Sequence, residues 1–156
     1  MTRGANLAVS RAVAALTLFA AWLIPAASAS AHPLGNFTVN HYARIEPASD
    51  AVRIVYVLDM AEIPAFQEQP RIIPDPEAYA TQRAEELRQN LHLTRNGQPL
   101  PLRLEQRSLT FPVGAGGLTT LRLEASYIAV LSSASAAPID LALRDDNDPT
   151  RIGWRE

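Results

Sequence analysis

The sequence contains no cysteine and no lysine, and each absence excludes a class of chemistry. Without thiolates the chain has no disulfide, no iron–sulfur cluster, no cysteine nucleophile and no thiolate zinc site. All 14 basic residues are arginines, and they are scattered along a chain of formal net charge −2. Phosphate binding requires a concentrated basic face. We therefore expect no nucleic-acid partner.

The sequence has one long apolar run, and it lies near the N-terminus. Arg3 and Arg11 precede the apolar stretch 13–24, and small residues follow it over 26–31. This three-part layout is typical of a secretory signal peptide. The run is shorter than the roughly 20 residues that a membrane-spanning helix requires. We expect residues 1–31 to be a signal peptide that delivers the protein to the periplasm or another extracytoplasmic space, with no membrane span after its removal.

Two positions satisfy the small-x-small rule for cleavage, namely after Ala29 and after Ala31. Both leave an exported domain over residues 32–156, of roughly 125 residues. This domain carries 12 arginines against 16 carboxylates, and its net charge is therefore −4. A chain of this length buries about two-thirds of its unfolded surface, so it folds without disulfides or a structural metal.

Most of the exported part alternates apolar and polar residues, as half-buried strands do. Asn96-Gly97 is a strong hairpin signal, because both residues tolerate positive φ. Pro99 and Pro101 indicate an edge strand. The second strand also has Val55 and Val57 on its other side, which predicts a central strand covered on both faces. The strands predicted from these patterns are 37–46, 52–60, 91–95, 100–104, 108–112, 118–131 and 139–143.

One helix is predicted between the second and third strands. Asp75 is a good N-cap and Pro76 suits the first helical position, where its missing N–H costs nothing. Ala80, Ala84 and Leu87 recur at helical spacing. Together the pattern predicts a mainly β domain, an antiparallel Ig-like β-sandwich of six to seven strands with one inserted helix.

The mature N-terminus is the sharpest metal candidate. If cleavage follows Ala29, His32 is the third residue, and the free amine, two amides and the imidazole form a square-planar nitrogen set that suits Ni(II) or Cu(II). If cleavage follows Ala31, Pro33 offers no amide, and His41 is the reserve ligand. The alternative is that 32–36 is only a turn before the first strand. The cofactors considered are Ni(II), Co(II) or Cu(II).

The other two histidines have ordinary explanations. His41 lies on the apolar face of the first strand, where a hydrogen-bonded core histidine is the commoner interpretation. His92 alternates outward from Leu91 and Leu93, as a solvated surface residue does. The three histidines show no metal-binding spacing.

Asp59 and Glu62 lie close together at the end of the second strand. Two such carboxylates perform acid–base chemistry or bind a cation in some proteins. More often they accept hydrogen bonds from backbone donors or cap a short helical turn. The chain has none of the standard hydrolase or phosphate-binding motifs, and residues 145–156 lack the glycine and ligand spacing of a calcium loop. We expect a binding protein and not an enzyme.

Three segments give the sequence a family resemblance. They are His32-Pro-Leu-Gly-Asn-Phe-Thr-Val-Asn-His-Tyr42, Asp59-Met-Ala-Glu-Ile-Pro-Ala-Phe-Gln-Glu68 and Arg151-Ile-Gly-Trp-Arg-Glu156. In this order they resemble the N-terminal extracytoplasmic region of bacterial nickel/cobalt transporter-family proteins. The resemblance implies a β-rich accessory domain of metal transport whose partner is a polytopic membrane transporter. Family transport residues lie on membrane helices, so none is carried over here.

The resemblance leaves alternatives open. The chain is either an accessory domain that binds a divalent metal at its mature N-terminus, or a metal-independent interaction module whose sandwich edge docks on a membrane partner. A third interpretation is a truncated N-terminal fragment of a larger membrane transporter.

Overall fold

The described chain is made of short strands, with two α-helices between the second and third strands. The computed structural model describes residues 35–131 and 139–156, all within the unit His32–Glu156. The elements in order are η1 (Gly35–Phe37), β1 (Val39–Pro47), β2 (Ala51–Met60), α2 (Glu62–Ile72), α3 (Pro76–Gln89), β3 (Leu91–Arg95), β4 (Gln98–Pro99), β5 (Arg103–Thr110), η2 (Ala115–Gly117), β6 (Leu121–Val130) and β7 (Leu141–Asp145).

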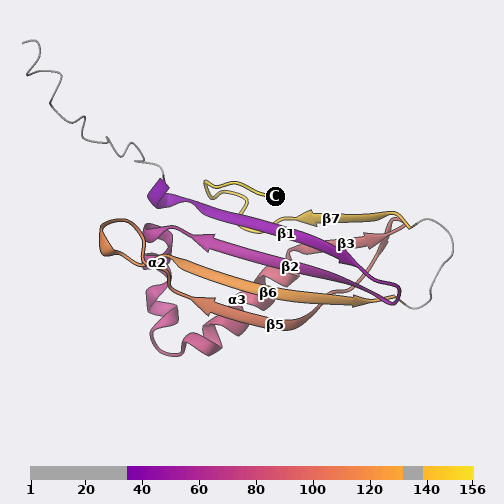
Figure 1. Ribbon diagram of the computed structural model, residues 1–156, viewed down its shortest axis with the longest axis horizontal. Helices are drawn as coiled ribbons and strands as arrows, with labels where there is room; N and C mark the ends of the chain where they lie inside the picture. The colour runs from indigo at the N-terminus through magenta and orange to yellow at the C-terminus, as the bar shows by residue number, and fades with distance from the viewer. Residues whose placement is uncertain (1–34, 132–138) are drawn as a thin grey trace, which may run out of the picture. The chain divides into compact units, whose positions relative to one another are not determined.

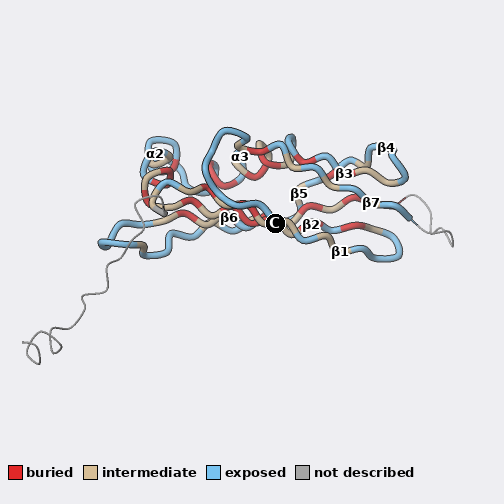
Figure 2. The backbone as a smooth tube through the Cα atoms, turned by 90° about the horizontal axis from the view of Figure 1, so that it is seen from above, coloured by how far each residue is buried: buried red, intermediate tan, exposed pale blue. Residues whose placement is uncertain are grey.

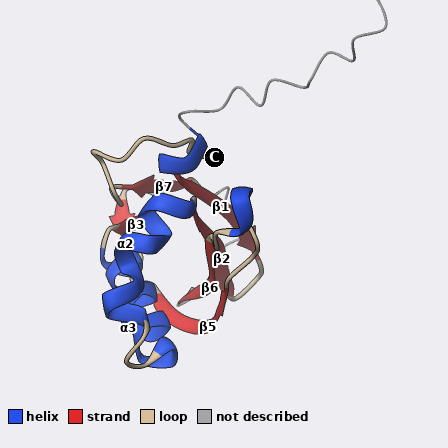
Figure 3. Cartoon of the chain, turned by 90° about the vertical axis from the view of Figure 1, so that its left-hand side faces the viewer, coloured by secondary structure: helices blue, strands red, loops and turns tan. Residues whose placement is uncertain are grey.

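The described strands form two antiparallel sheets. The larger sheet has the order β1-β2-β6-β5, and the smaller has the order β4-β3-β7 (Figure 1). The four-stranded sheet is one layer, and α3 with the three-stranded sheet makes the second layer over its inner face (Figure 3). The predicted mainly β, antiparallel sandwich is confirmed.

The core lies between the two layers, where the buried segments of the chain face one another (Figure 2). Each strand of the four-stranded sheet contributes the apolar side chains that alternate toward the inner face. Helix α3 contributes one buried stripe of alanine and leucine side chains. Tyr127 on β6 donates its hydroxyl hydrogen bond to the carbonyl oxygen of Ala84 on α3, at 2.7 Å. The fully buried members of this core include Val52, Ile54, Tyr56, Leu58, Ala84, Leu87, Leu123 and Tyr127.

The predicted helix begins where the sequence indicates. The Oδ1 atom of Asp75 accepts a hydrogen bond from the backbone amide of Ala78 at 3.0 Å, and Pro76 occupies the first turn. Ala80, Ala84 and Leu87 form its buried stripe. The prediction of this helix is confirmed.

A second helix, α2, was not predicted. Pro64 and Pro70 interrupt its sequence and suggest irregular structure. Pro64 falls in the first turn, where the backbone N–H has no intrahelical acceptor, so proline is tolerated there. Pro70 lies near the end, and only the last turn follows it. The sandwich therefore carries two helices, not one.

The region after the hairpin also differs from prediction. Asn96 and Gly97 take φ of 51° and 75°, as the hairpin required. Strand β4 is only two residues long, on the edge of its sheet, and the predicted separate strands 100–104 and 108–112 are one strand, β5, with a register shift between Leu104 and Gln106. The prolines explain the short β4, because proline donates no ladder hydrogen bond.

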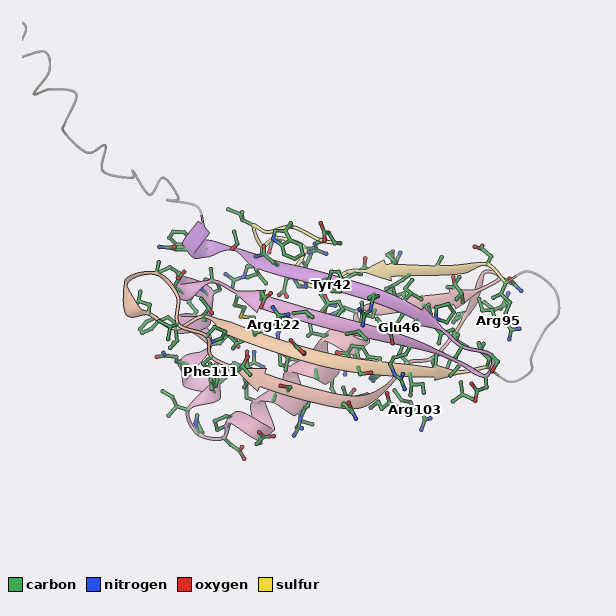
Figure 4. All side chains as sticks on the ribbon, viewed as in Figure 1. Tyr42, Glu46, Arg95, Arg103, Phe111 and Arg122 are labelled. Atoms are coloured by element: carbon green, nitrogen blue, oxygen red, sulfur yellow. The ribbon has the colours of Figure 1, made fainter. Side chains whose placement is uncertain are left out.

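Strand β2 is central, with β1 and β6 as its neighbours, but its second face has no covering layer among the described residues. The prediction that β2 is a central strand is therefore confirmed, and the prediction that both of its faces are covered was wrong. Val57 is nevertheless buried, because its cross-strand neighbours Tyr42 and Glu124 flank it. Figure 4 shows Tyr42 and Arg122 on this open face. Within the described residues, no helix combines the length and apolar character needed to cross a bilayer.

Candidate functional site

The three segments that carry the family resemblance are brought together by the fold. The described part of the first, residues 35–42, forms η1 and the start of β1. The second runs from the end of β2 into α2, and the third is the segment 151–156. The amide of Ala61 donates to the carbonyl oxygen of Thr38 at 2.9 Å, which joins the first two. Nη1 of Arg151 donates to Oε1 of Gln67 at 3.3 Å, which joins the second and third. We call the surface formed by residues 35–42, 61–68 and 151–156 the three-motif surface.

The C-terminal segment runs parallel to β1 along its outer edge. The amides of Val39, His41 and Ala43 donate to the carbonyl oxygens of Ile152, Trp154 and Glu156, at 2.8, 3.0 and 2.7 Å. The amide of Glu156 returns a bond of 3.1 Å to the carbonyl oxygen of His41. An exposed sheet edge presents unpaired backbone groups, so this segment satisfies the first half of the β1 edge.

Gly153 permits this close approach. A Cβ atom at position 153 would lie 1.9 Å from the carbonyl oxygen of Val39. No side chain fits into that space, so the glycine is required by contact with the strand and not by its own φ. The Gly-Trp pair of the third motif thus has a packing reason.

Large apolar side chains remain exposed on the three-motif surface. Phe37 is 50% exposed, Trp154 49% and Ile152 61%, and Phe66 on α2 is 65% exposed. Single exposed apolar residues are ordinary, but four on one surface are typical of a protein-interaction site. Tryptophan and phenylalanine are also enriched among residues that anchor interfaces.

His41 lies beneath this surface as a buried, hydrogen-bonded core residue. Its Nδ1 atom is 2.6 Å from the hydroxyl oxygen of Tyr56, and the Tyr56 hydroxyl donates to Oδ2 of Asp145 at 2.7 Å. Since that hydroxyl proton goes to Asp145, the network assigns the imidazole proton to Nδ1 and leaves the lone pair on Nε2. The interpretation of His41 as a core histidine agrees with this arrangement.

Nε2 of His41 has no hydrogen-bond partner and lies 3.6 Å from Oδ2 of Asp148. Burial lowers the pKa of His41 and outweighs the carboxylates of Asp145 and Asp148, which act in the opposite direction. The ring is therefore neutral at pH 7, and the contact with Asp148 is not an ion pair. Nη2 of Arg83 already donates to the same Asp148 oxygen at 2.7 Å. A metal bound to both His41 Nε2 and Asp148 Oδ2 would compete with this arginine for the Asp148 oxygen.

The end of β7, which supplies Asp145, and the loop after it, which supplies Asp148, are fixed from two sides. The Asn147 amide group is buried and donates to the carbonyl oxygen of Leu87 at 3.1 Å and to Oδ1 of Asp145 at 2.7 Å. From the C-terminal segment, the Arg155 guanidinium donates to the carbonyl oxygens of Asp145, Asn147 and Asp148. The carboxylates of Asp145 and Asp148 and the backbone carbonyl oxygens of residues 145, 147 and 148 thus accept hydrogen bonds from other residues of the protein.

Asp59 and Glu62 have structural roles. The Asp59 carboxylate pairs with Nη1 of Arg122 at 2.9 Å. The Glu62 side chain is buried, and its Oε1 accepts a hydrogen bond from the amide of Ala115 at 2.6 Å. Glu62 thus accepts from a backbone donor, as the structural interpretation expected, whereas Asp59 is held by an arginine side chain and not by a backbone donor. Glu62 also stands in the first turn of α2, where a negative charge is favoured.

Two of the three histidines, His41 and His92, lie within the described residues. His32 lies outside the described residues, so its proposed chelate stays a prediction. His92 is exposed as predicted, with Nε2 3.3 Å from Oδ2 of Asp146. Across residues 35–131 and 139–156, no three His, Asp or Glu side chains are grouped so as to hold a metal ion.

Sequence reasoning missed Tyr56, Arg83, Asn147 and Arg155 as members of this site. Tyr56 had a usable signal, because a tyrosine on the apolar face of a central strand needs a partner for its hydroxyl. The other three carried none, because their partners are distant in sequence. Comparisons with protein-family models, with curated proteins and with solved structures found no match.

Proposed function

We propose that this chain is an exported accessory domain of a nickel/cobalt transport system and that it acts by binding a polytopic membrane partner through the three-motif surface. The observation that carries the proposal is the convergence of three distant segments into one surface with four exposed large apolar residues. The same segments carry the family resemblance. The signal peptide 1–31 would deliver the domain to the periplasmic side, where such a partner presents its loops.

Two features favour binding over catalysis. The Tyr56, Asp145 and Asn147 side chains are hydrogen-bonded to one another, and Tyr56 and Asn147 are fully buried. The exposed part of the surface is apolar, and apolar anchors stabilise a contact with another protein. An accessory domain of this kind positions or stabilises its partner.

The metal contact belongs at the mature N-terminus. His32, three residues before η1, would supply the imidazole of a nitrogen chelate, while His41 is occupied by Tyr56. Calorimetric titration of the processed protein with Ni(II), Co(II) and Cu(II), beside the His32→Ala variant, tests this role. Equal affinities for both proteins would remove the metal from the proposal and leave the interaction module.

Site-specific photocrosslinking tests the surface. A benzophenone amino acid at Trp154 or Ile152 should capture a polytopic membrane protein in cells, and the same group at Val130 is the matched control. Val130 is also exposed, at 58%, but it lies at the end of β6 outside the three-motif surface. Capture that persists with a chelator supports metal-independent docking. Equal capture from all three positions, or none, would contradict the proposal.

A further inference from the structure

A groove of about 770 Å³ lies on the three-stranded sheet, away from the three-motif surface. Leu91 and Leu93 are buried in the core, so strand alternation directs His92 and Thr94 to the opposite side. The register places Arg144 beside His92, and Ala142 beside Thr94. The groove is of the size that small-molecule sites have in proteins.

The lining is apolar with cationic groups at its rim. Its 13 residues include two arginines and one histidine, and no aspartate or glutamate. Pro99, Pro101 and Ala142 are exposed apolar residues within it. A ligand that complements this lining has an apolar body and negative charge at one end.

Arg144 already binds one carboxylate of the protein, that of Asp146, beside the groove. Its Nη2 lies 3.0 Å from Oδ2 of Asp146, and Nε2 of His92 lies 3.3 Å from the same oxygen. The side chain of Arg144 is 71% exposed, and its remaining N–H groups have no partner among the described residues. A guanidinium has five donors and binds carboxylates through two parallel hydrogen bonds, so a second carboxylate can be accommodated.

Two carboxylates next to the groove disfavour a ligand with more than one negative charge. Nε of Arg88 is paired with Glu85 at 2.5 Å, and Arg144 is paired with Asp146. These two carboxylates lie just outside the lining and would repel a dianion. A monoanion gains the donors of the arginines while it meets less repulsion.

We propose that this groove binds an amphipathic monocarboxylate, with its carboxylate at Arg144 and its apolar chain along Ala142, Pro99 and Pro101. The site is independent of the proposed transport role, because it shares no residue with the three-motif surface. It gives the domain a small-molecule ligand of its own.

Titration of the full chain with decanoate, followed by amide chemical shifts in NMR spectra, tests the site. Saturable shifts should appear at His92, Thr94, Ala142 and Arg144. Decanol tests the apolar chain without the charge, and acetate tests the charge without the chain. Both should bind at least about tenfold more weakly than decanoate, a difference of about 1.4 kcal/mol.

Two variants with a matched control complete the experiment. Arg144→Glu should weaken decanoate binding at least about tenfold, and Ala142→Trp should abolish it by filling the groove. Arg103→Glu makes the same charge change on β5 and should leave binding unchanged. The proposal is overturned if decanol binds as tightly as decanoate, if Arg144→Glu has no effect, or if the shifts map elsewhere.

Discussion

Glu62 lies so close to Gly114 that no side chain fits at position 114 unless the Glu62 carboxylate moves. A Cβ atom on Gly114 would lie 2.3 Å from Oε1 of Glu62, the atom that accepts the amide hydrogen bond of Ala115. The first turn of α2 and the loop before β6 are therefore built around one carboxylate. The glycine is required by this carboxylate and by Thr120, whose Cγ2 atom would lie 2.8 Å from the same Cβ, and not by an unusual φ.

The first prediction concerns this contact. Gly114→Ala should destabilise the domain by about 1–3 kcal/mol, because the buried carboxylate must move or lose its amide donor. In a Glu62→Ala background the added methyl group meets no carboxylate, so its cost should fall. Urea denaturation of both single variants and the double variant measures the coupling. Simple additivity of the two changes would contradict the assigned contact.

Removal of one buried hydroxyl should weaken the link between the two layers. Tyr127→Phe deletes the donor to the Ala84 carbonyl and leaves that oxygen without this bond. The expected loss is about 0.5–1.5 kcal/mol in the free energy of unfolding. Tyr42→Phe, on the open face of the large sheet, is the control and should change stability by less. Equal losses from the two variants would show that the Tyr127 bond is not specific.

The buried histidine should make stability depend on pH. Burial lowers the pKa of His41, and Arg155 and Arg83 act in the same direction, while Asp145 and Asp148 oppose it. As the pH falls below about 6.5, the unfolded chain binds a proton that the folded chain does not. The free energy of unfolding should therefore decrease with pH until the lower folded pKa is passed.

The His41→Asn variant isolates this contribution. Asparagine keeps an N–H near Tyr56 and does not titrate, so it should show a shallower decrease in stability below pH 6.5. His92→Asn replaces an exposed histidine and should retain the wild-type dependence. Denaturation curves between pH 8 and pH 5 measure all three proteins. A wild-type slope in His41→Asn would mean that other groups cause the dependence.

The fourth prediction concerns the C-terminal segment. Gly153→Ala places a methyl group against the Val39 carbonyl and should detach residues 152–156 from β1. The amides of Val39, His41 and Ala43 should then lose protection from hydrogen exchange. Ile152→Ala alters the same segment without a clash and should keep that protection. Unchanged exchange in Gly153→Ala would be incompatible with the observed edge pairing.

Local patterns predicted much of this fold, because they depend on neighbouring residues. Alternation identified β1 and β2, Asp75-Pro76 identified the start of α3, and Asn96-Gly97 identified the hairpin. The α2 helix was missed because its two prolines argue against a helix. Pro64 stands in the first turn, where proline is tolerated, and Pro70 costs the helix one hydrogen bond without ending it. The open face of β2 was missed because Val57 is buried by cross-strand neighbours and not by another layer.

The candidate site was less accessible from sequence. His41 was placed correctly on the apolar face, since that depends on strand period alone. The carboxylates near it, Asp145 at the end of β7 and Asp148 in the loop that follows, are distant in sequence, and only the assembled layers bring them together. Arg155 has no local pattern at all, because it binds backbone carbonyls.

The pairing of residues 152–156 with residues 39–43 joins the two ends of the described chain. The first strand of the large sheet obtains hydrogen bonds from a segment that lies at the far end of the described residues, so its edge stays incomplete until that segment docks. Closing such a long loop is slow relative to local folding. Until then the strand edge is open to other chains, and a variant without residues 151–156 would keep that edge open and be prone to self-association.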